Sequence, residues 1–133
     1  PEVRRMLLFQ KAVAAGSLSL LLECARYADL IEVTEGEERE NYNLLLDILT
    51  PIAKTFPAEY GIKSVSEAMQ VFGGYGYCED FPIEQLYRDI RIASIYEGTT
   101  AIQSQDLLGR KLTMKNGAAA MALMQEVSKT LQE

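Results

Sequence analysis

Residues 41–76 read NYNLLLDILTPIAKTFPAEYGIKSVSEAMQVFGGYG. Apolar side chains recur there at three- and four-residue steps up to Phe72, a spacing that predicts an amphipathic helix with one buried face. The glycine-rich end of the stretch, residues 73–76, then predicts a stop, because glycine readily adopts the left-handed conformation that ends helices. Within the stretch, Thr50-Pro51 predicts either a kink or a new helix start, with Thr50 as N-cap and proline at the first helical position.

The rest of the chain repeats this helical pattern. Apolar residues at helical spacing predict further helices over residues 2–32, 82–92, 100–112 and 117–131. The polar residues 34–40 predict the turn between the first two helices. No segment alternates polar and apolar side chains as a strand would, and no internal repeat is visible. The sequence therefore predicts an all-α protein, an up-and-down bundle of long helices.

The composition is that of one globular domain: 133 residues, 48% apolar and 24% charged. A net charge of −6 argues against a broad electropositive face for nucleic acid. Histidine is absent and Cys24 and Cys78 are the only cysteines, so we expect no metal site, two free thiols in a reducing compartment, and no Ser-His or Cys-His nucleophile pair. Any acid–base work then falls to carboxylates, lysine or tyrosine. No clean apolar run reaches the length of a membrane-spanning helix, so no membrane span is expected.

Two breaks between helices carry the candidate chemistry, although each alone has a plain structural explanation. The glycines of residues 73–76 allow close approach of another molecule, but more often they only end a helix. Glu97, directly before Gly98 at the mouth of a helix, is able to point into a cleft, but such a residue is more often solvated or a partner of the helix dipole. Between the breaks, Arg88 and Arg91 predict a structural ion-pair cluster that joins helices, in preference to a catalytic role.

Three segments taken together are far more specific than their parts. They read Gln-x-x-Gly-Gly-x-Gly-Tyr from Gln70, Pro-x-Glu-x-x-Tyr-Arg-Asp-x-Arg-Ile from Pro82, and Ile-Tyr-Glu-Gly-Thr from Ile95. In this order they resemble the C-terminal signature of the acyl-CoA dehydrogenase family, densely over residues 70–112 and more loosely back to about Val3. The run from Thr99 to Lys111 most resembles a longer subgroup that includes 3-methylmercaptopropionyl-CoA dehydrogenase-like enzymes.

The resemblance implies an enzyme that performs α,β-dehydrogenation of an acyl-CoA thioester, with FAD as hydride acceptor. Glu97 matches the base that takes the α-proton, and its backbone N–H matches a donor to the thioester carbonyl. Tyr96 and Gly98 match residues that line the acyl-CoA site. The family's cofactor contacts fall on Thr99, close to the flavin, and on Gln70, Gly73 and Gly74, which match a segment touching the FAD of a neighbouring subunit. A homo-oligomer is therefore implied, with electron-transfer flavoprotein as the electron acceptor.

The resemblance also implies how the chain is divided. Residues 1–112 match part of the family's C-terminal helical domain, and residues 113–133 are expected to form the helical start of a C-terminal extension. The first helix of the bundle and the family's two other domains are not in this sequence, so we expect exposed apolar surface, weak or no FAD binding and no turnover from the isolated chain. A bacterial cytoplasm is the preferred location, with the mitochondrial matrix as the alternative.

Two other functions remain open at this point. An acyl-CoA oxidase of the same superfamily shares the flavin and the base but passes electrons to oxygen. A stand-alone helical module that binds a partner without chemistry would suit a short chain with apolar helices. The order Glu97-Gly98-Thr99 favours the enzyme, because a scaffold does not require it.

Overall fold

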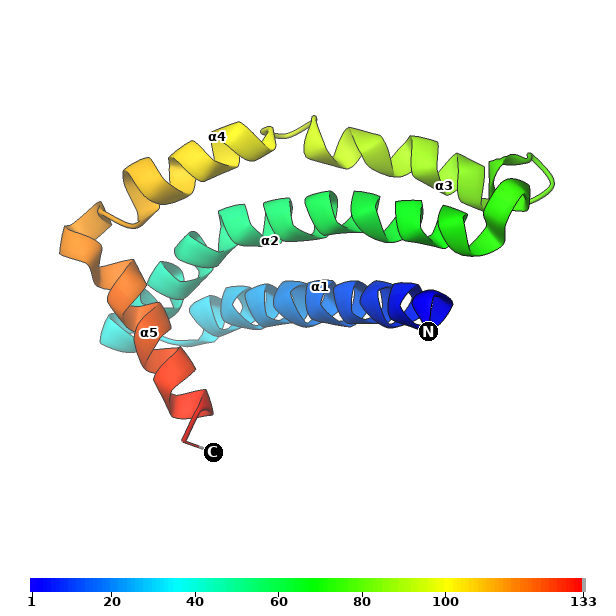
Figure 1. Cartoon of the computed structure of the whole chain (residues 1–133). Helices are drawn as coiled ribbons and strands as arrows, with labels where there is room; N and C mark the ends of the chain where they lie inside the picture. The colour runs from blue at the N-terminus through cyan, green and yellow to red at the C-terminus, as the bar shows by residue number, and fades with distance from the viewer. Residues whose placement is uncertain (133) are drawn as a thin grey trace. The chain divides into compact units, whose positions relative to one another are not determined.

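The computed structural model describes residues 1–132, and every regular element in that part of the chain is helical. The α-helices follow one another along the chain (Figure 1), with the bounds α1 Glu2–Val33, α2 Gly36–Phe72, α3 Ile83–Ile90, α4 Thr100–Gln105 and α5 Ala118–Thr130. Shorter helical turns lie between them: η1 Gly73–Tyr77, η2 Arg91–Ser94, η3 Asp106–Lys111 and η4 Met114–Gly117. The predicted all-α fold is confirmed.

The junction of the first two helices is shorter than the sequence predicted. α1 ends at Val33 and α2 begins at Gly36, so the predicted turn over residues 34–40 is wrong in most of its length. Glu37 and Glu38 lie in the first turn of α2. Carboxylates are favoured there because they interact with the positive end of the helix dipole. The polar composition therefore marked a helix start and not a loop.

α2 continues through Pro51 without interruption. The Thr50 hydroxyl donates to the backbone carbonyl of Leu46 at 2.6 Å, a bond to the preceding helical turn and not an N-cap bond to a following amide. Of the two predicted alternatives at Thr50-Pro51, a new helix start is therefore wrong.

Contacts divide the chain into two compact units, each of which contains part of α1 and part of α2. Unit 1 comprises Pro1–Ser19 and Thr55–Thr100. Unit 2 comprises Leu20–Lys54 and the residues from Ala101 onward. Both predicted site segments, the glycine-rich turn and the Glu97 loop, lie in unit 1.

Within unit 1, α1 and α2 run antiparallel. Arg5 pairs with Glu67 at 3.2 Å near one end, and Gly16 faces the Phe56 ring near the other, where an added Cβ would meet that ring at 3.8 Å. α3 returns along α2 (Figure 1).

The close approach of α3 to α2 depends on a glycine. A Cβ at Gly61 would lie only 2.8 Å from Cδ1 of Ile90, which is inside van der Waals contact. The absent side chain at Gly61 therefore lets Ile90 pack directly against the backbone of α2.

Unit 2 has the larger buried core. Leu45 and Ile48 are 0% and 2% exposed, and the core consists of Tyr27, Leu45, Ile48, Leu49, Ala119 and Ala122. Alanines on α5 let that helix lie close to its neighbours in this core. The buried ammonium of Lys111 pairs with the carboxylate of Asp47 at the edge of the same unit.

The predicted helix over residues 100–112 divides into two parts. α4 ends at Gln105, and η3 continues it as a wider π-helical segment. Lys115, Asn116 and Gly117 then all have positive φ, at 50°, 58° and 81°, which turns the chain before α5 begins. The predicted tail helix over residues 117–131 agrees with α5.

α1 is more apolar than the sequence analysis allowed. By length and composition it passes the test for a helix able to cross a membrane, with a mean hydropathy of 1.4 over 18 residues, of which 6% are buried. By length and composition, the expectation that no segment would be long and apolar enough to span a membrane is therefore wrong. Residues 6–22 contain only one charged side chain, Lys11. Length and composition alone are weak support for a span, since core helices pass the same test. The exposed apolar side chains of α1 include Val3, Leu7, Leu8, Leu18, Leu21 and Leu22.

Candidate functional site

The glycine-rich turn after α2 has one open face and one closed face. Gly73 has a φ of 61°, and a Cβ placed on Gly73 or Gly74 would meet nothing within 4 Å. By contrast, a Cβ on Gly76 would lie 2.6 Å from the backbone oxygen of Met69. Gly76 is therefore required by the packing of this chain, whereas Gly73 and Gly74 leave the backbone accessible to another molecule.

Aromatic rings hold this turn in place from one side. The Phe72 and Phe81 ring centroids are 5.4 Å apart, and Tyr75 meets Phe81 edge-on at 5.9 Å. The backbone N–H of Cys78 donates to the carbonyl of Tyr75 at 3.1 Å and closes the end of η1. These contacts fix the turn without covering the Cβ positions of the two open glycines.

The second candidate segment is a tight left-handed turn between η2 and α4. The amides of Ile95 and Tyr96 both donate to the carbonyl of Ile92, at 2.9 and 3.1 Å, and end the preceding helical turn. Glu97 then has a φ of 52° and Gly98 a φ of 94°. Left-handed backbone is uncommon for a residue with a side chain and costs free energy, so the surrounding structure must hold Glu97 in this conformation.

The residues of this turn lie at the surface of the described chain. Glu97 and Thr99 are exposed, and Tyr96 is 52% exposed. Gly98 is half-buried. The predicted site residues Tyr96, Glu97, Gly98 and Thr99 therefore form one contiguous surface segment in which the three residues with side chains are exposed.

A hydrogen bond from a distant helix holds the end of this turn. The Thr100 hydroxyl, at the first residue of α4, donates to the carboxylate of Glu59 on α2. Glu59 is half-buried. Sequence reasoning missed Glu59, because nothing in the pattern of α2 distinguishes it from a solvated charge.

The two predicted parts of the site are not brought together in one chain. Gly73 and Gly74 come before α3, and Glu97 comes after η2, so the segment 83–94 separates them (Figure 1). The eight residues of α3 alone span about 12 Å. Gln70, Gly73 and Gly74 therefore form one candidate surface, and residues 96–99 form another.

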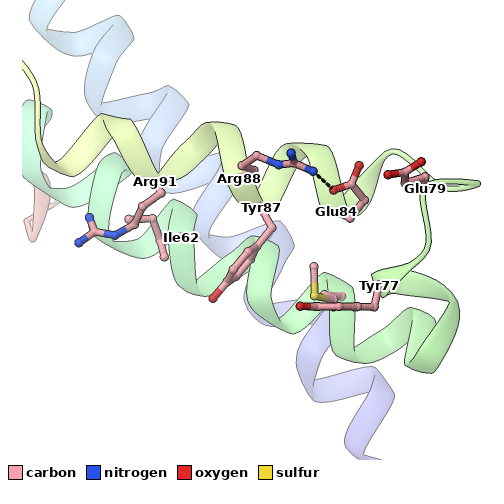
Figure 2. Close-up of a pocket in the computed structure, with 8 residues that line it drawn as sticks. Ile62, Tyr77, Glu79, Glu84, Tyr87, Arg88 and Arg91 are labelled. Carbon is pink, nitrogen blue, oxygen red and sulfur yellow. Dashed lines mark hydrogen bonds and ion pairs between the residues drawn. The ribbon is translucent and has the colours of Figure 1, made fainter.

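One cavity in unit 1 has none of the predicted site residues in its lining. It has a volume of about 580 Å³, and its lining (Figure 2) comprises Ile62, Met69, Tyr77, Glu79, Glu84, Tyr87, Arg88 and Arg91. Its two arginines have local partners. Arg88 pairs with Glu84 at 2.5 Å within α3, and Arg91 donates to the Ser94 hydroxyl. The hydrogen bond with Glu84 raises the pKa of Arg88, which keeps the guanidinium charged.

These contacts correct the predicted ion-pair cluster. The partners found for Arg88 and Arg91 lie one helical turn away in the same segment, so the expected bridge between helices is wrong. Arginine and glutamate four residues apart on one helix pair locally, because that spacing places them on the same face.

The described residues contain no group of three or more cysteine, aspartate or glutamate side chains placed to bind a metal ion. Both cysteines are free thiols, with Cys24 half-buried and Cys78 exposed. Burial raises the pKa of the Cys24 thiol.

A family model described as the C-terminal domain of acyl-CoA dehydrogenase matches residues 3–112. Curated relatives align over nearly the whole chain. The 3-methylmercaptopropionyl-CoA dehydrogenase of Ruegeria pomeroyi is 38% identical over 130 residues, which is 98% of this chain and 22% of that protein. The broad-specificity linear acyl-CoA dehydrogenase FadE5 of Mycobacterium tuberculosis is 40% identical over 121 residues, 90% of this chain and 20% of that protein.

A solved structure gives the same result for the fold. The apo form of Bd2924 superposes with a TM-score of 0.63 and 32% sequence identity, over 89% of this chain and 24% of that one. The chain thus spans about a fifth of the length of the curated relatives it matches.

Proposed function

Because the chain belongs to the acyl-CoA dehydrogenase family through its C-terminal domain, we propose that the whole protein is an FAD-dependent enzyme that dehydrogenates an acyl-CoA thioester between its α and β carbons. In this proposal Glu97 is the base for the α-proton, and Tyr96 and Gly98 line the bound thioester. Thr99 lies next to the flavin. One observation carries the assignment: the left-handed turn that presents Glu97 at the surface.

The left-handed conformation of Glu97 costs free energy that an unstrained connection between two helices would not cost. A non-glycine residue in the left-handed region costs on the order of 1–3 kcal/mol, and such residues concentrate at functional sites. Glycine or asparagine at position 97 would make the same turn with less strain. A glutamate there is therefore best explained by what its carboxylate does, and Gly98 beside it leaves room for a substrate.

The glycine-rich turn fits a cofactor that lies flat against backbone. Since nothing lies within 4 Å of a Cβ at Gly73 or Gly74, a planar or phosphate-bearing group is able to approach the main chain there. When bound, FAD supplies the hydride acceptor for the β-hydrogen. The separation of this turn from Glu97 by residues 83–94 favours a homo-oligomer, in which Gln70, Gly73 and Gly74 hold the FAD that serves a second copy.

The protein residues have three tasks in this reaction. The Glu97 carboxylate accepts the proton that leaves the α-carbon. The backbone N–H of Glu97 donates to the thioester carbonyl, which stabilises the negative charge that develops as the proton departs. Tyr96 covers the acyl group and excludes water from the reacting atoms.

Partners and context follow from the same proposal. We favour a dehydrogenase over an oxidase because the relatives are named dehydrogenases, which makes electron-transfer flavoprotein the expected acceptor. The isolated 133-residue chain is expected to lack turnover and stoichiometric FAD, since it covers about a fifth of those relatives. A bacterial cytoplasm is the expected location.

The test is Glu97→Gln in the full-length protein, assayed with a panel of acyl-CoA thioesters and an artificial electron acceptor. We expect the flavin absorbance of the variant to match that of the parent, while turnover falls by at least about a hundredfold, as is typical for loss of a general base. Glu79→Gln is the matched control, because that carboxylate lies outside the Glu97 turn. Turnover by Glu97→Gln near the parent rate would refute Glu97 as the base.

A further inference from the structure

We propose that Glu59 is a positioning residue for the reaction: by accepting a hydrogen bond from Thr100, it holds the Glu97 turn in its left-handed conformation. This inference rests on the proposed function of Glu97. Glu59 and Thr100 are 41 residues apart in sequence and belong to different elements of unit 1. Their hydrogen bond therefore connects the turn to α2, a helix of 37 residues.

The position of the bond along the chain gives it this effect. Thr100 follows the two left-handed residues Glu97 and Gly98 with one residue between, and it is the first residue of α4. On the other side, the turn is fixed by the amides of Ile95 and Tyr96 on the carbonyl of Ile92. The strained segment is thus held on both sides, and the Glu59 bond contributes to holding the side that leads into α4.

The hydrogen bond between Thr100 and Glu59 is of a kind strong enough to offset part of the strain in the left-handed turn. A hydroxyl that donates to an ionised carboxylate makes a stronger bond than one that donates to a neutral oxygen. Glu59 and Thr100 are both half-buried, so solvent competes less for this bond than it would at an exposed site. The carboxylate of Glu59 supplies both an acceptor oxygen and a negative charge, so the amide of Glu59→Gln separates the effect of the acceptor oxygen from the effect of charge.

The experiment uses the full-length flavoprotein with four variants: Glu59→Ala, Glu59→Gln, Thr100→Val and Thr100→Ser. The first readout is amide hydrogen exchange in residues 95–100, which requires no turnover. Glu59→Ala and Thr100→Val are expected to raise that exchange roughly tenfold, the size expected for loss of one hydrogen bond to a charged group. Thr100→Ser keeps a hydroxyl donor and is expected to stay near the parent. Glu59→Gln keeps an acceptor oxygen but loses the charge, so its exchange is expected to lie between those of the parent and Glu59→Ala.

The second readout is steady-state kinetics. Glu59→Ala and Thr100→Val are expected to lower kcat roughly tenfold, because a base that is displaced from the α-carbon stabilises the transition state less. KM for the thioester and the flavin content should change little. The double variant is expected to be no worse than either single variant, since both remove the same bond. Glu67→Ala is the matched control, because Glu67 lies on the same helix but pairs with Arg5.

Several outcomes would overturn the inference. Unchanged exchange at residues 95–100 in both Glu59→Ala and Thr100→Val would do so, as would additive losses in the double variant. If Glu59→Ala fails to fold, the pair Thr100→Val and Thr100→Ser decides the question alone: equal exchange in the two refutes the bond. Failure of the proposed function is distinguishable, because it appears as normal turnover by Glu97→Gln and leaves the exchange readout intact.

Discussion

Gly76 lies directly against the backbone of Met69: a Cβ at Gly76 would be 2.6 Å from the Met69 carbonyl oxygen and 3.1 Å from its Cγ. Backbone cannot move aside as the end of a flexible side chain can. Gly76→Ala is therefore expected to destabilise the turn after α2 by about 1–3 kcal/mol, the usual cost of overpacking. Urea denaturation measures the change, and a loss below about 0.5 kcal/mol, the range of ordinary surface substitutions, would contradict the packing argument.

Gly74→Ala is the matched variant and has a different expected result. No atom lies within 4 Å of the added methyl group, so the midpoint of unfolding should stay near that of the parent. In the full-length protein, the same methyl group occupies the face that we assign to FAD. Loss of flavin with unchanged stability supports that assignment, whereas full flavin occupancy counts against it.

Gln10 on α1 has a buried polar atom that lowers the stability of the fold, and a substitution is expected to remove this loss. Its side-chain nitrogen is buried and has no hydrogen-bond partner within residues 1–132. Gln10→Met keeps the length of the side chain and removes the unsatisfied donor, so we expect stability to rise by about 1 kcal/mol. Thermal unfolding measures this change. Gln85→Met serves as the control, because the Gln85 amide donates to Asp89 at 2.8 Å on the surface of α3. A lower melting temperature for Gln10→Met would contradict the expectation.

Tyr27 in the core of unit 2 makes stability depend on alkaline pH. Burial, and then its hydrogen bond with Glu23, raises the pKa of Tyr27 from 10.0 to about 12. The folded state therefore holds the phenolic proton more tightly than the unfolded state does, so this contribution to stability is complete below pH 10 and is lost as pH rises toward 12. Tyr27→Phe is expected to flatten the fall in urea midpoint across that window.

Tyr77→Phe is the control for this titration, since the Tyr77 side chain is 83% exposed. Its alkaline profile should follow that of the parent. If the urea midpoints of Tyr27→Phe and Tyr77→Phe fall equally steeply with rising pH, burial of Tyr27 does not cause the pH dependence.

Lys111 and Asp47 form an ion pair whose two members are not equivalent. The Lys111 side chain is 6% exposed and that of Asp47 is 44% exposed. Asp47→Ala leaves a buried ammonium without this partner and is expected to cost about 1–3 kcal/mol. Lys111→Met in the Asp47→Ala background removes the stranded charge, so it should recover most of that loss. Guanidinium denaturation of the single and double variants measures both steps, and a double variant less stable than Asp47→Ala would contradict this account.

Local patterns predicted the helices well where one physical rule governed the segment. The spacing of apolar residues gave α1, α5 and the body of α2, and the glycines at 73–76 marked the end of α2. The prediction failed at residues 34–40, where acidic side chains are compatible with a loop and with a helix start. It also failed to show that η3 widens into a π-helical segment, because that depends on what the segment packs against.

By itself, the sequence determined that this protein is helical and that its candidate functional residues lie in two breaks between helices. It also identified Glu97 as the carboxylate residue of the second break. These are local properties, set by side-chain spacing, glycine content and motif order. Only the tertiary structure decided that Glu97 is held left-handed, that Glu59 reaches Thr100 across 41 residues, and that Gly76 is enclosed while Gly74 is open. These features depend on which residues, far apart in sequence, the packing of the helices brings into contact. The periodicity of side chains along one segment carries no information about such contacts.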